Sequence, residues 1–220
     1  MQDICSPAWV AALPAAKEAS QLFIAACAGT DSSDAFVSMH EKDGNGCWKQ
    51  ILSSQGFIGK NGLCQDADHR EGCDKTPSGI YHFNKAFGIA ADPGCSFPYV
   101  RVNEHLWWSG DPDRLYNRMV DIREVPDLLQ DSSEHLEEYM PEYQYCLNIS
   151  FNEEGMPGRG SAIFLHCTGL FPYTRGCVAA PENVMKQVMR AVHQDCTVII
   201  DTQEKLFSSC AFPNAGRGTI

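Results

Sequence analysis

A cysteine and a histidine eleven residues apart are the residues of this chain best suited to chemistry. His166 directly follows an apolar run, residues 161–165, that predicts a strand. Cys177 follows a loop that contains glycine and proline. The thiolate is the nucleophilic form of cysteine, and a free thiol with a pKa of about 8.5 is little ionised at neutral pH. Cys177 therefore needs a base, and His166 can supply it if the strand end and the loop fold back on each other.

Gly176 directly precedes Cys177. A glycine lets the backbone approach a substrate and exposes N–H groups that can stabilise an oxyanion. No Asp or Asn lies close to His166 in the sequence, so a backbone carbonyl is the expected partner that orients its ring. The alternative interpretation is structural, because a histidine at a strand end is often only a satisfied polar residue and a single cysteine is often a small buried hydrophobe.

The segment around Cys177 resembles the signature of the L,D-transpeptidase (YkuD-like) catalytic domain. That signature is a histidine, a loop, and then Ser/Thr-His-Gly-Cys followed by an apolar residue. Here His166 and Gly169 precede Thr-Arg-Gly-Cys-Val at residues 174–178. The nucleophile and the histidine of the signature are both present.

Two further segments resemble the same family. Thr-Pro-Ser-Gly at residues 76–79 is similar to the family's Thr-Pro-x-Gly segment, which enters a strand. Trp108, followed by Tyr116 and Asn117, is a weaker likeness. The segments occur in the family's order, and the resemblance covers about residues 56–200, roughly two thirds of the chain.

The chain also departs from the family's pattern. Arg175 stands where much of the family has a second histidine, the loop from His166 to Thr174 is shorter than usual, and Ala179 stands where Asn or Arg is common. Arg175 cannot act as a base, because its guanidinium stays charged. It remains able to hold a substrate carboxylate.

The resemblance implies acyl transfer in the bacterial cell wall. Cys177 would attack the carbonyl on the L-centre of a diamino acid in a peptidoglycan tetrapeptide stem. His166 would take the thiol proton and later protonate the leaving D-Ala. The Cys167 carbonyl would orient the His166 ring, and the backbone N–H groups of Gly176 and Cys177 would form the oxyanion hole.

The acceptor decides the product. An amine of a second stem would give a crosslink or anchor a wall partner, whereas water would give L,D-carboxypeptidase activity. Substrate contacts are expected from Thr174, Arg175, Gly169 and Tyr116, with Trp107 and Trp108 as further walls of the cleft. Two alternatives belong to other classes: a cysteine peptidase or amidase of unrelated fold, and an inactive wall-binding module.

The elements that must position these residues are mostly short strands. Residues 22–27, 35–40 and 47–52 predict a β-meander over residues 20–55, with a turn at Asp-Gly-Asn-Gly. Residues 56–79 predict a long loop. Further strands are expected at residues 80–83, 99–102, 106–109, 119–122, 143–150, 161–167 and 197–200. The acidic residues 126–142 predict a solvated surface excursion.

One longer helix is predicted at about residues 181–194. It has proline and glutamate in its first turn and an apolar stripe containing Val184, Val188 and Val192. Many short strands with few helices predict a mainly β fold, a barrel or sandwich with this C-terminal helix and surface loops. The expected organisation is an N-terminal extension (1–19), a catalytic domain (20–204) and a C-terminal tail (205–220).

The composition of the chain argues against two kinds of partner, nucleic acid and the membrane interior. The net charge of −11 argues against a nucleic-acid groove, which needs clustered Lys and Arg. No apolar run approaches the roughly 20 residues of a membrane helix, so no stable membrane insertion is expected. Peptidoglycan stem peptides are the implied partner, without a cofactor or metal. The N-terminus does not predict an export signal, so the extracytoplasmic location that the resemblance implies, in the cell wall or periplasm, requires a removed segment.

Eleven cysteines leave at least one thiol unpaired. Several are expected to be small buried residues. Cys64 and Cys73 are the best candidates for a local disulfide. A zinc site formed by Cys64, His69 and Cys73 is a weaker alternative, because the pattern lacks a clear fourth ligand.

Overall fold

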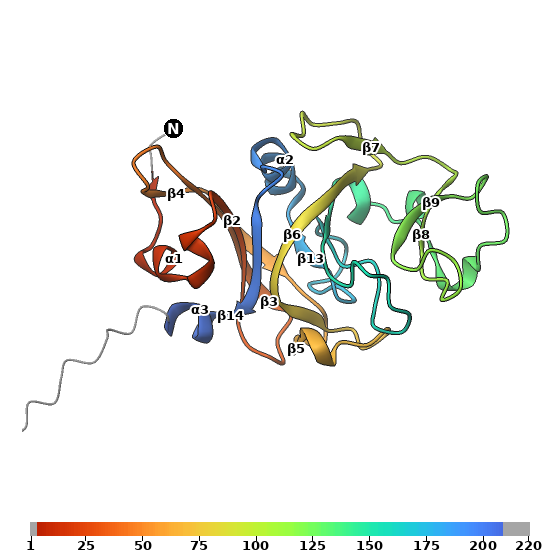
Figure 1. Cartoon of the computed structure of the whole chain (residues 1–220), viewed down its shortest axis with the longest axis horizontal. Coiled ribbons are helices and arrows are strands. Elements are labelled where there is room, and N and C mark those ends of the chain that lie inside the picture. The colour runs from red at the N-terminus through yellow and green to blue at the C-terminus, as the bar shows by residue number, and fades with distance from the viewer. Residues whose placement is uncertain (1–3, 209–220) are drawn as a thin grey trace, which may run out of the picture.

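The main sheet collects strands from both ends of the chain and closes on itself. The computed structural model describes residues 4–208. The strand order is β1-β4-β13-β12-β11-β6-β14-β2-β3, and β3 also pairs with β4. This pairing joins the last strand of the order to the second, so the strands from β4 to β3 form the barrel expected of a mainly β chain, with β1 added at the side of β4 (Figure 1).

The strands of the main sheet differ widely in length. Those along its order are β1 (Ile4–Cys5), β2 (Gln21–Cys27), β3 (Asp34–Lys42), β4 (Trp48–Phe57), β6 (Thr76–Gly88), β11 (Cys146–Ile149), β12 (Phe164–Cys167), β13 (Val178–Ala180) and β14 (Thr197–Thr202). Two short strands, β5 (Leu63–Gln65) and β7 (Tyr99–Arg101), pair with β6 alone.

The predicted meander is confirmed. β2 pairs antiparallel with β3, and β3 pairs antiparallel with β4. Every residue of β2 is buried, because both of its faces are covered. Phe23 and Ala25 point into the barrel core, whereas Leu22 and Ile24 pack in a second cluster with the N-terminal segment. That segment contains α1 (Ala8–Ala12) and a 3₁₀ turn, η1 (Pro14–Lys17).

The predicted C-terminal helix is also present, as α2 (Glu182–Ala191). Its apolar stripe, with Val184, Met185, Val188 and Met189, is buried in the barrel core. Fully burying such a side chain contributes about 1.5–3 kcal/mol. After β14 the described chain ends in α3 (Gln203–Ser208). No helix within residues 4–208 is long and apolar enough to cross a membrane.

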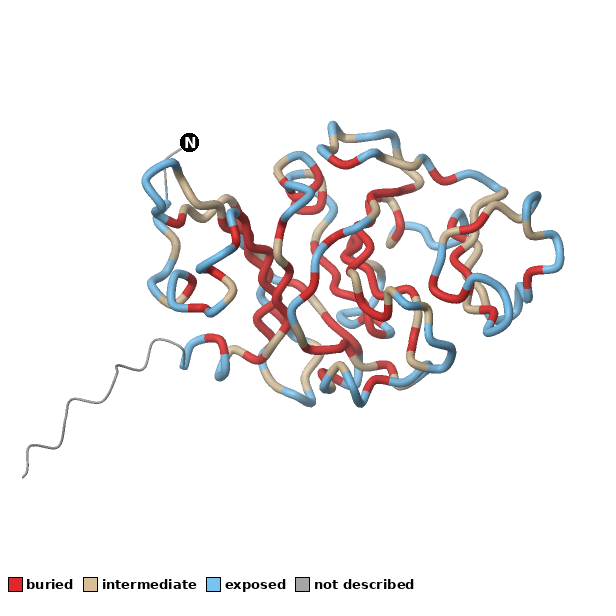
Figure 2. The backbone as a smooth tube through the Cα atoms, viewed as in Figure 1, coloured by how far each residue is buried: buried red, intermediate tan, exposed pale blue. Residues whose placement is uncertain are grey.

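A small second sheet lies beside the barrel. It has the order β10-β8-β9, formed by β8 (Leu106–Ser109), β9 (Arg118–Asp121) and β10 (Glu134–His135). Figure 1 shows these strands at one end of the long axis, and Figure 2 shows buried backbone both there and along the barrel strands. A third apolar cluster joins the two parts, with Trp108 from the small sheet and Phe164 from the barrel.

Several predicted boundaries were wrong. Residues 56–79 are not one long loop, since they include the end of β4, all of β5, a 3₁₀ turn η2 (Asp66–Asp68) and the start of β6. The strand predicted at 143–150 begins only at Cys146, after the 3₁₀ turn η5 (Glu142–Gln144). The strand predicted at 161–167 begins at Phe164, because Ala162 has a φ of 56° and leaves the extended conformation.

Most of the acidic stretch 126–142 is exposed, as predicted, but the stretch is also attached to the small sheet. It contains the turns η3 (Gln130–Ser132) and η4 (Leu136–Glu138) on either side of β10. Leu136 is completely buried in the third cluster. Because β10 pairs antiparallel with β8, with Glu134 opposite Trp108, this stretch is bound to the small sheet.

The cysteines form no disulfide within residues 4–208, so the candidate Cys64–Cys73 bridge is absent. His69 is not free to bind zinc with them. Its Nδ1 lies 2.8 Å from the Arg159 carbonyl oxygen, and its Nε2 lies 3.0 Å from the Lys75 carbonyl oxygen. The described residues also hold no group of three or more potential metal-binding side chains. Cys210 lies outside the described residues.

Candidate active site

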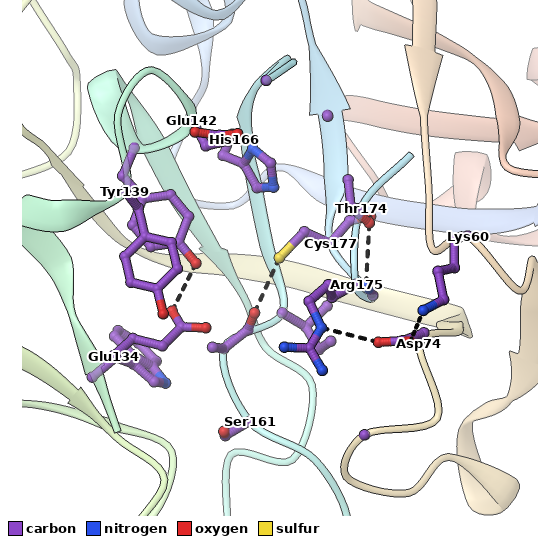
Figure 3. Close-up of a pocket in the computed structure, with 18 of the residues that line it drawn as sticks. Lys60, Asp74, Glu134, Tyr139, Glu142, Ser161, His166, Thr174, Arg175 and Cys177 are labelled. Carbon is purple, nitrogen blue, oxygen red and sulfur yellow. Dashed lines mark hydrogen bonds and ion pairs between the residues drawn. The ribbon is translucent and has the colours of Figure 1, made fainter. Parts of the chain in front are cut away.

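His166 lies on β12, and Cys177 directly precedes the adjacent strand β13, on the same side of the sheet. β12 and β13 are parallel, with Leu165 opposite Val178 and His166 opposite Ala179. Successive side chains of a strand point to opposite faces. Leu165 and Val178 point into the barrel core, so His166 and Cys177 point outward, toward the small sheet. Figure 3 shows the His166 ring directed toward the Cys177 side chain.

The tautomer of His166 follows from its hydrogen bond. Nδ1 lies 2.7 Å from the Cys167 carbonyl oxygen. A carbonyl only accepts, so Nδ1 carries the proton and Nε2 of the neutral ring is left as the basic nitrogen. Burial lowers the pKa of His166, although the Cys167 carbonyl and Glu142 act in the opposite direction. The net shift favours the neutral ring.

The Cys177 thiol is held within the barrel wall. Its Sγ donates to the Ala162 carbonyl oxygen at 3.1 Å and accepts from the Phe164 N–H at 3.3 Å. Burial raises the pKa of Cys177 to about 12; the Phe164 N–H opposes this shift and the charge of Glu134 adds to it. Burial thus favours the neutral form of both the Cys177 thiol and the His166 ring.

Two threonine hydroxyls shape the loop that carries Cys177. Thr174 Oγ1 accepts from the Gly176 N–H at 3.1 Å and donates to the Cys177 carbonyl at 2.7 Å. Thr76 Oγ1 accepts from the Gly59 N–H at 2.9 Å and lies 2.7 Å from the Gly176 carbonyl oxygen. Gly176 has a φ of 147°, which favours glycine.

These bonds change two predicted roles. The Thr174 hydroxyl was expected to contact a substrate, but it makes both of its bonds inside the loop. The Gly176 N–H was expected to be one of two oxyanion donors, but it already donates to Thr174. The N–H of Cys177 is therefore the better candidate of the two for binding an oxyanion.

Arg175 is at the mouth of the site and is anchored by a carboxylate. Its Nε donates to Asp74 Oδ1 at 3.1 Å, and Lys60 Nζ lies 2.6 Å from Asp74 Oδ2. The two cations hold the pKa of the Asp74 carboxyl below its usual range, with the Lys60 hydrogen bond as the main cause. The Arg175 side chain is 83% exposed, so solvent and ligands can reach its guanidinium.

His166 and Cys177 line a cavity of about 610 Å³ between the barrel and the small sheet. Ligand sites typically measure about 300–1,000 Å³. The small-sheet side contributes Trp108 and Glu134, with Tyr143 from the following turn. The loop between β12 and β13 contributes Gly169, Phe171, Tyr173, Thr174, Arg175 and Gly176.

Glu134 is a cavity residue that sequence reasoning missed. The Tyr143 hydroxyl donates to its Oε2 at 2.7 Å. Burial raises the pKa of Glu134 to about 7; the Tyr143 hydrogen bond and Arg175 oppose this shift, and Glu71 adds to it. No sequence signal separates Glu134 from its acidic neighbours, because only the pairing of β10 with β8 turns it inward.

Two of the expected contact residues are elsewhere. The Tyr116 hydroxyl is occupied by Glu71 and by the Gly160 N–H, and Tyr116 is not among the residues that line the cavity. Trp107 stacks on His135 with ring centroids 4.5 Å apart, and it also lies outside the cavity lining. Their polar or aromatic groups are used to hold the small sheet and its connections.

Asn117 connects the weaker sequence motif to the site. Its Oδ1 accepts from Trp108 Nε1 at 3.0 Å and from the Ala162 N–H at 3.1 Å. The carbonyl of the same Ala162 accepts the Cys177 thiol. The motifs that contain Thr76 and Asn117 are therefore both connected to the motif of Cys177, through Gly176 and Ala162 respectively.

Two solved structures are similar to this chain, both at low sequence identity. No family model matches the chain, and no curated protein matches it. One similar solved structure is the helical cell shape determining protein Pgp2 from Campylobacter jejuni, at 16% identity and a TM-score of 0.42. Another is the Ldtfm-avibactam carbamoyl enzyme, at 13% identity and a TM-score of 0.37.

Both matches cover most of this chain but only about half of the matched chain. They cover 84% and 83% of this chain but 49% of each of the other two chains, so this chain spans about half the length of either structure.

Proposed function

We propose that this protein is a cysteine acyltransferase of the L,D-transpeptidase type, which acts on peptidoglycan stem peptides outside the membrane. The observation that carries the proposal is that His166, on β12, and Cys177, directly before the adjacent strand β13, line the same cavity. The His166 ring is fixed by the Cys167 carbonyl, with its basic nitrogen available to the thiol.

The resting thiol must first leave its present partner. Its proton is donated to Ala162, and its pKa of about 12 disfavours a free thiolate. We therefore expect the thiol to turn toward His166 when a stem peptide fills the cavity. Proton transfer to Nε2 then accompanies attack of sulfur on the carbonyl carbon, rather than preceding it.

The remaining steps conserve atoms and charge. Attack forms the S–C bond and a tetrahedral oxyanion, for which the Cys177 N–H is the best placed donor. The C–N bond to D-Ala breaks, and Nε2–H of His166 protonates the leaving amine. The thioester on Cys177 is then attacked by an amine of a second stem, giving a crosslink and restoring the thiol, or by water, giving the L,D-carboxypeptidase reaction.

The test is acylation and turnover of the purified protein. Exposure to a carbapenem should add one drug mass to the intact protein, and a tetrapeptide stem should release D-Ala. Both results should be lost in Cys177→Ser. His166→Ala should slow turnover by about 10²–10⁴-fold, the usual contribution of a general base. Full activity in either variant would overturn the proposal, and release of L-amino acids from ordinary peptides would indicate a peptidase instead.

One observation favours a second candidate. The Cys177 thiol donates to the Ala162 carbonyl, and its raised pKa keeps it protonated. An unreactive thiol of this kind is expected in a stem-binding module that has lost catalysis. Such a module would bind a tetrapeptide stem but would not be acylated by a carbapenem. Calorimetry with the stem and mass spectrometry with the drug therefore separate the two candidates.

A further inference from the structure

Glu134 reaches the cavity from the side opposite the barrel. It lies on β10, whereas Cys177 belongs to the barrel wall, and both line the same cavity. Figure 3 shows the Glu134 carboxylate and the Cys177 sulfur within one view of the site. A ligand that fills the cavity with its carbonyl at Cys177 would therefore also reach Glu134.

The position of the Glu134 carboxylate is fixed. Tyr143 donates to its Oε2 at 2.7 Å, and the Tyr143 ring stacks on Tyr139 with centroids 4.7 Å apart. Tyr143 is buried. A carboxylate oriented by a buried neighbour loses little conformational freedom when a ligand binds it.

The charge of Glu134 is not balanced by a cation. Within residues 4–208, no ion pair includes this carboxylate. The two cations of the cavity lining, Arg175 and Lys60, are both bonded to Asp74. A partly buried carboxylate without a cation is costly, so a site that retains one is a candidate for binding a positive charge.

We propose that Glu134 binds a primary ammonium group on the acyl-donor peptide and so selects donors that carry a free side-chain amine near the attacked carbonyl. The stacked tyrosines add to this selection, because aromatic faces attract ammonium groups. This inference rests on the proposed function, since it assumes that a peptide is the acyl donor. It gives Glu134 a role in specificity that is separate from the chemistry at sulfur.

The test compares two donors and four proteins. One donor is a tetrapeptide stem with a free amine on its third side chain, and the other is the same peptide with that amine acetylated. The proteins are the wild type, Glu134→Gln, Tyr143→Phe and, as a matched control, Glu137→Gln. Glu137 is an exposed residue of η4 that does not line the cavity.

We expect the wild type and Glu137→Gln to prefer the free-amine donor. Glu134→Gln should lower kcat/KM for that donor by about 10- to 100-fold and leave the acetylated donor unchanged, because only the charged hydrogen bond is lost. Tyr143→Phe should reduce the preference in the same direction but less. Equal losses for both donors, or an unchanged preference in Glu134→Gln, would overturn the inference.

A binding measurement separates this inference from the chemistry. In the Cys177→Ala background no acylation can occur, yet calorimetry should still show tighter binding of the free-amine peptide, and Glu134→Gln should remove the difference. If the wild type were never acylated, the proposed function would fail and the binding result would stand alone. If binding were equal for both peptides while acylation proceeded, the role of Glu134 would fail alone.

Discussion

The Thr76 hydroxyl lies 2.7 Å from the carbonyl oxygen of Gly176, one hundred residues further along the chain. Thr76 begins the Thr-Pro-Ser-Gly motif, and Gly176 directly precedes the cysteine of the second motif. The same hydroxyl accepts from the Gly59 N–H, where β4 has just ended. One buried side chain thus connects the start of β6, the end of β4 and the loop that carries Cys177.

Replacing Thr76 by alanine should weaken this junction. Thr76 is completely buried, so the Gly59 N–H would lose its acceptor without access to water. We expect the free energy of unfolding to fall by about 1–3 kcal/mol, measured by denaturant titration. The rate of carbapenem acylation at Cys177 should fall as well. Thr76→Ser keeps the hydroxyl and should restore the acylation rate; wild-type acylation in Thr76→Ala would show that the junction does not position the nucleophile.

Gly176→Ala should damage the same loop by a different route. The new Cβ would meet the Lys75 carbonyl oxygen and Ile163 Cδ1, each at 3.1 Å, in a backbone conformation that L-residues rarely adopt. The strain should cost about 1–3 kcal/mol in thermal or denaturant unfolding. Gly44→Ala is the matched control, because no atom lies within 4 Å of its added Cβ. Equal stabilities of the two variants would contradict the strain.

The elements that could be predicted are those with a continuous apolar run or a regular apolar period. β2 and β14 contain short continuous apolar runs, and α2 repeats its apolar residues every three to four positions; the apolar clusters bury these residues. That His166 and Cys177 lie at one cavity could be predicted, because they belong to one short segment that folds back between two neighbouring strands. The family likeness at Thr76 marked the right segment, although its bond to Gly176 was not foreseen.

The features that could not be predicted depend on distant pairing. β10 has only two residues, too few to show any period, and its place beside β8 decides that Glu134 faces the cavity. Likewise, nothing in the residue types shows that the Thr174 hydroxyl takes the Gly176 N–H rather than a substrate group. Tyr116 was predicted to contact the substrate, but its hydroxyl binds Glu71, which comes from a loop remote in the sequence.

The state of the Cys177 thiol leads to a prediction about simple alkylating reagents. Iodoacetamide reacts with thiolates, and a pKa raised to about 12 leaves Cys177 almost wholly protonated at pH 7–8. Cys177 should be alkylated about 10-fold or more slowly than the exposed Cys5 and Cys47, as followed by peptide mapping. A carbapenem should show the opposite order, because it occupies the cavity and uses His166 as a base. Rapid alkylation of Cys177 by iodoacetamide would instead indicate a preformed thiolate–imidazolium pair.

The preference for a free-amine donor should depend on pH through Glu134. Its carboxyl has a pKa raised to about 7, so it is charged above that pH and neutral below it. Burial is the main cause of the raised pKa; among the neighbouring groups, Tyr143 and Arg175 lower it and Glu71 raises it. An alkyl ammonium stays charged to about pH 10. The ratio of kcat/KM for the free-amine and acetylated donors should therefore rise between about pH 6 and pH 8. In Glu134→Gln the ratio should stay flat, and a rise that persisted there would assign the titration to another group.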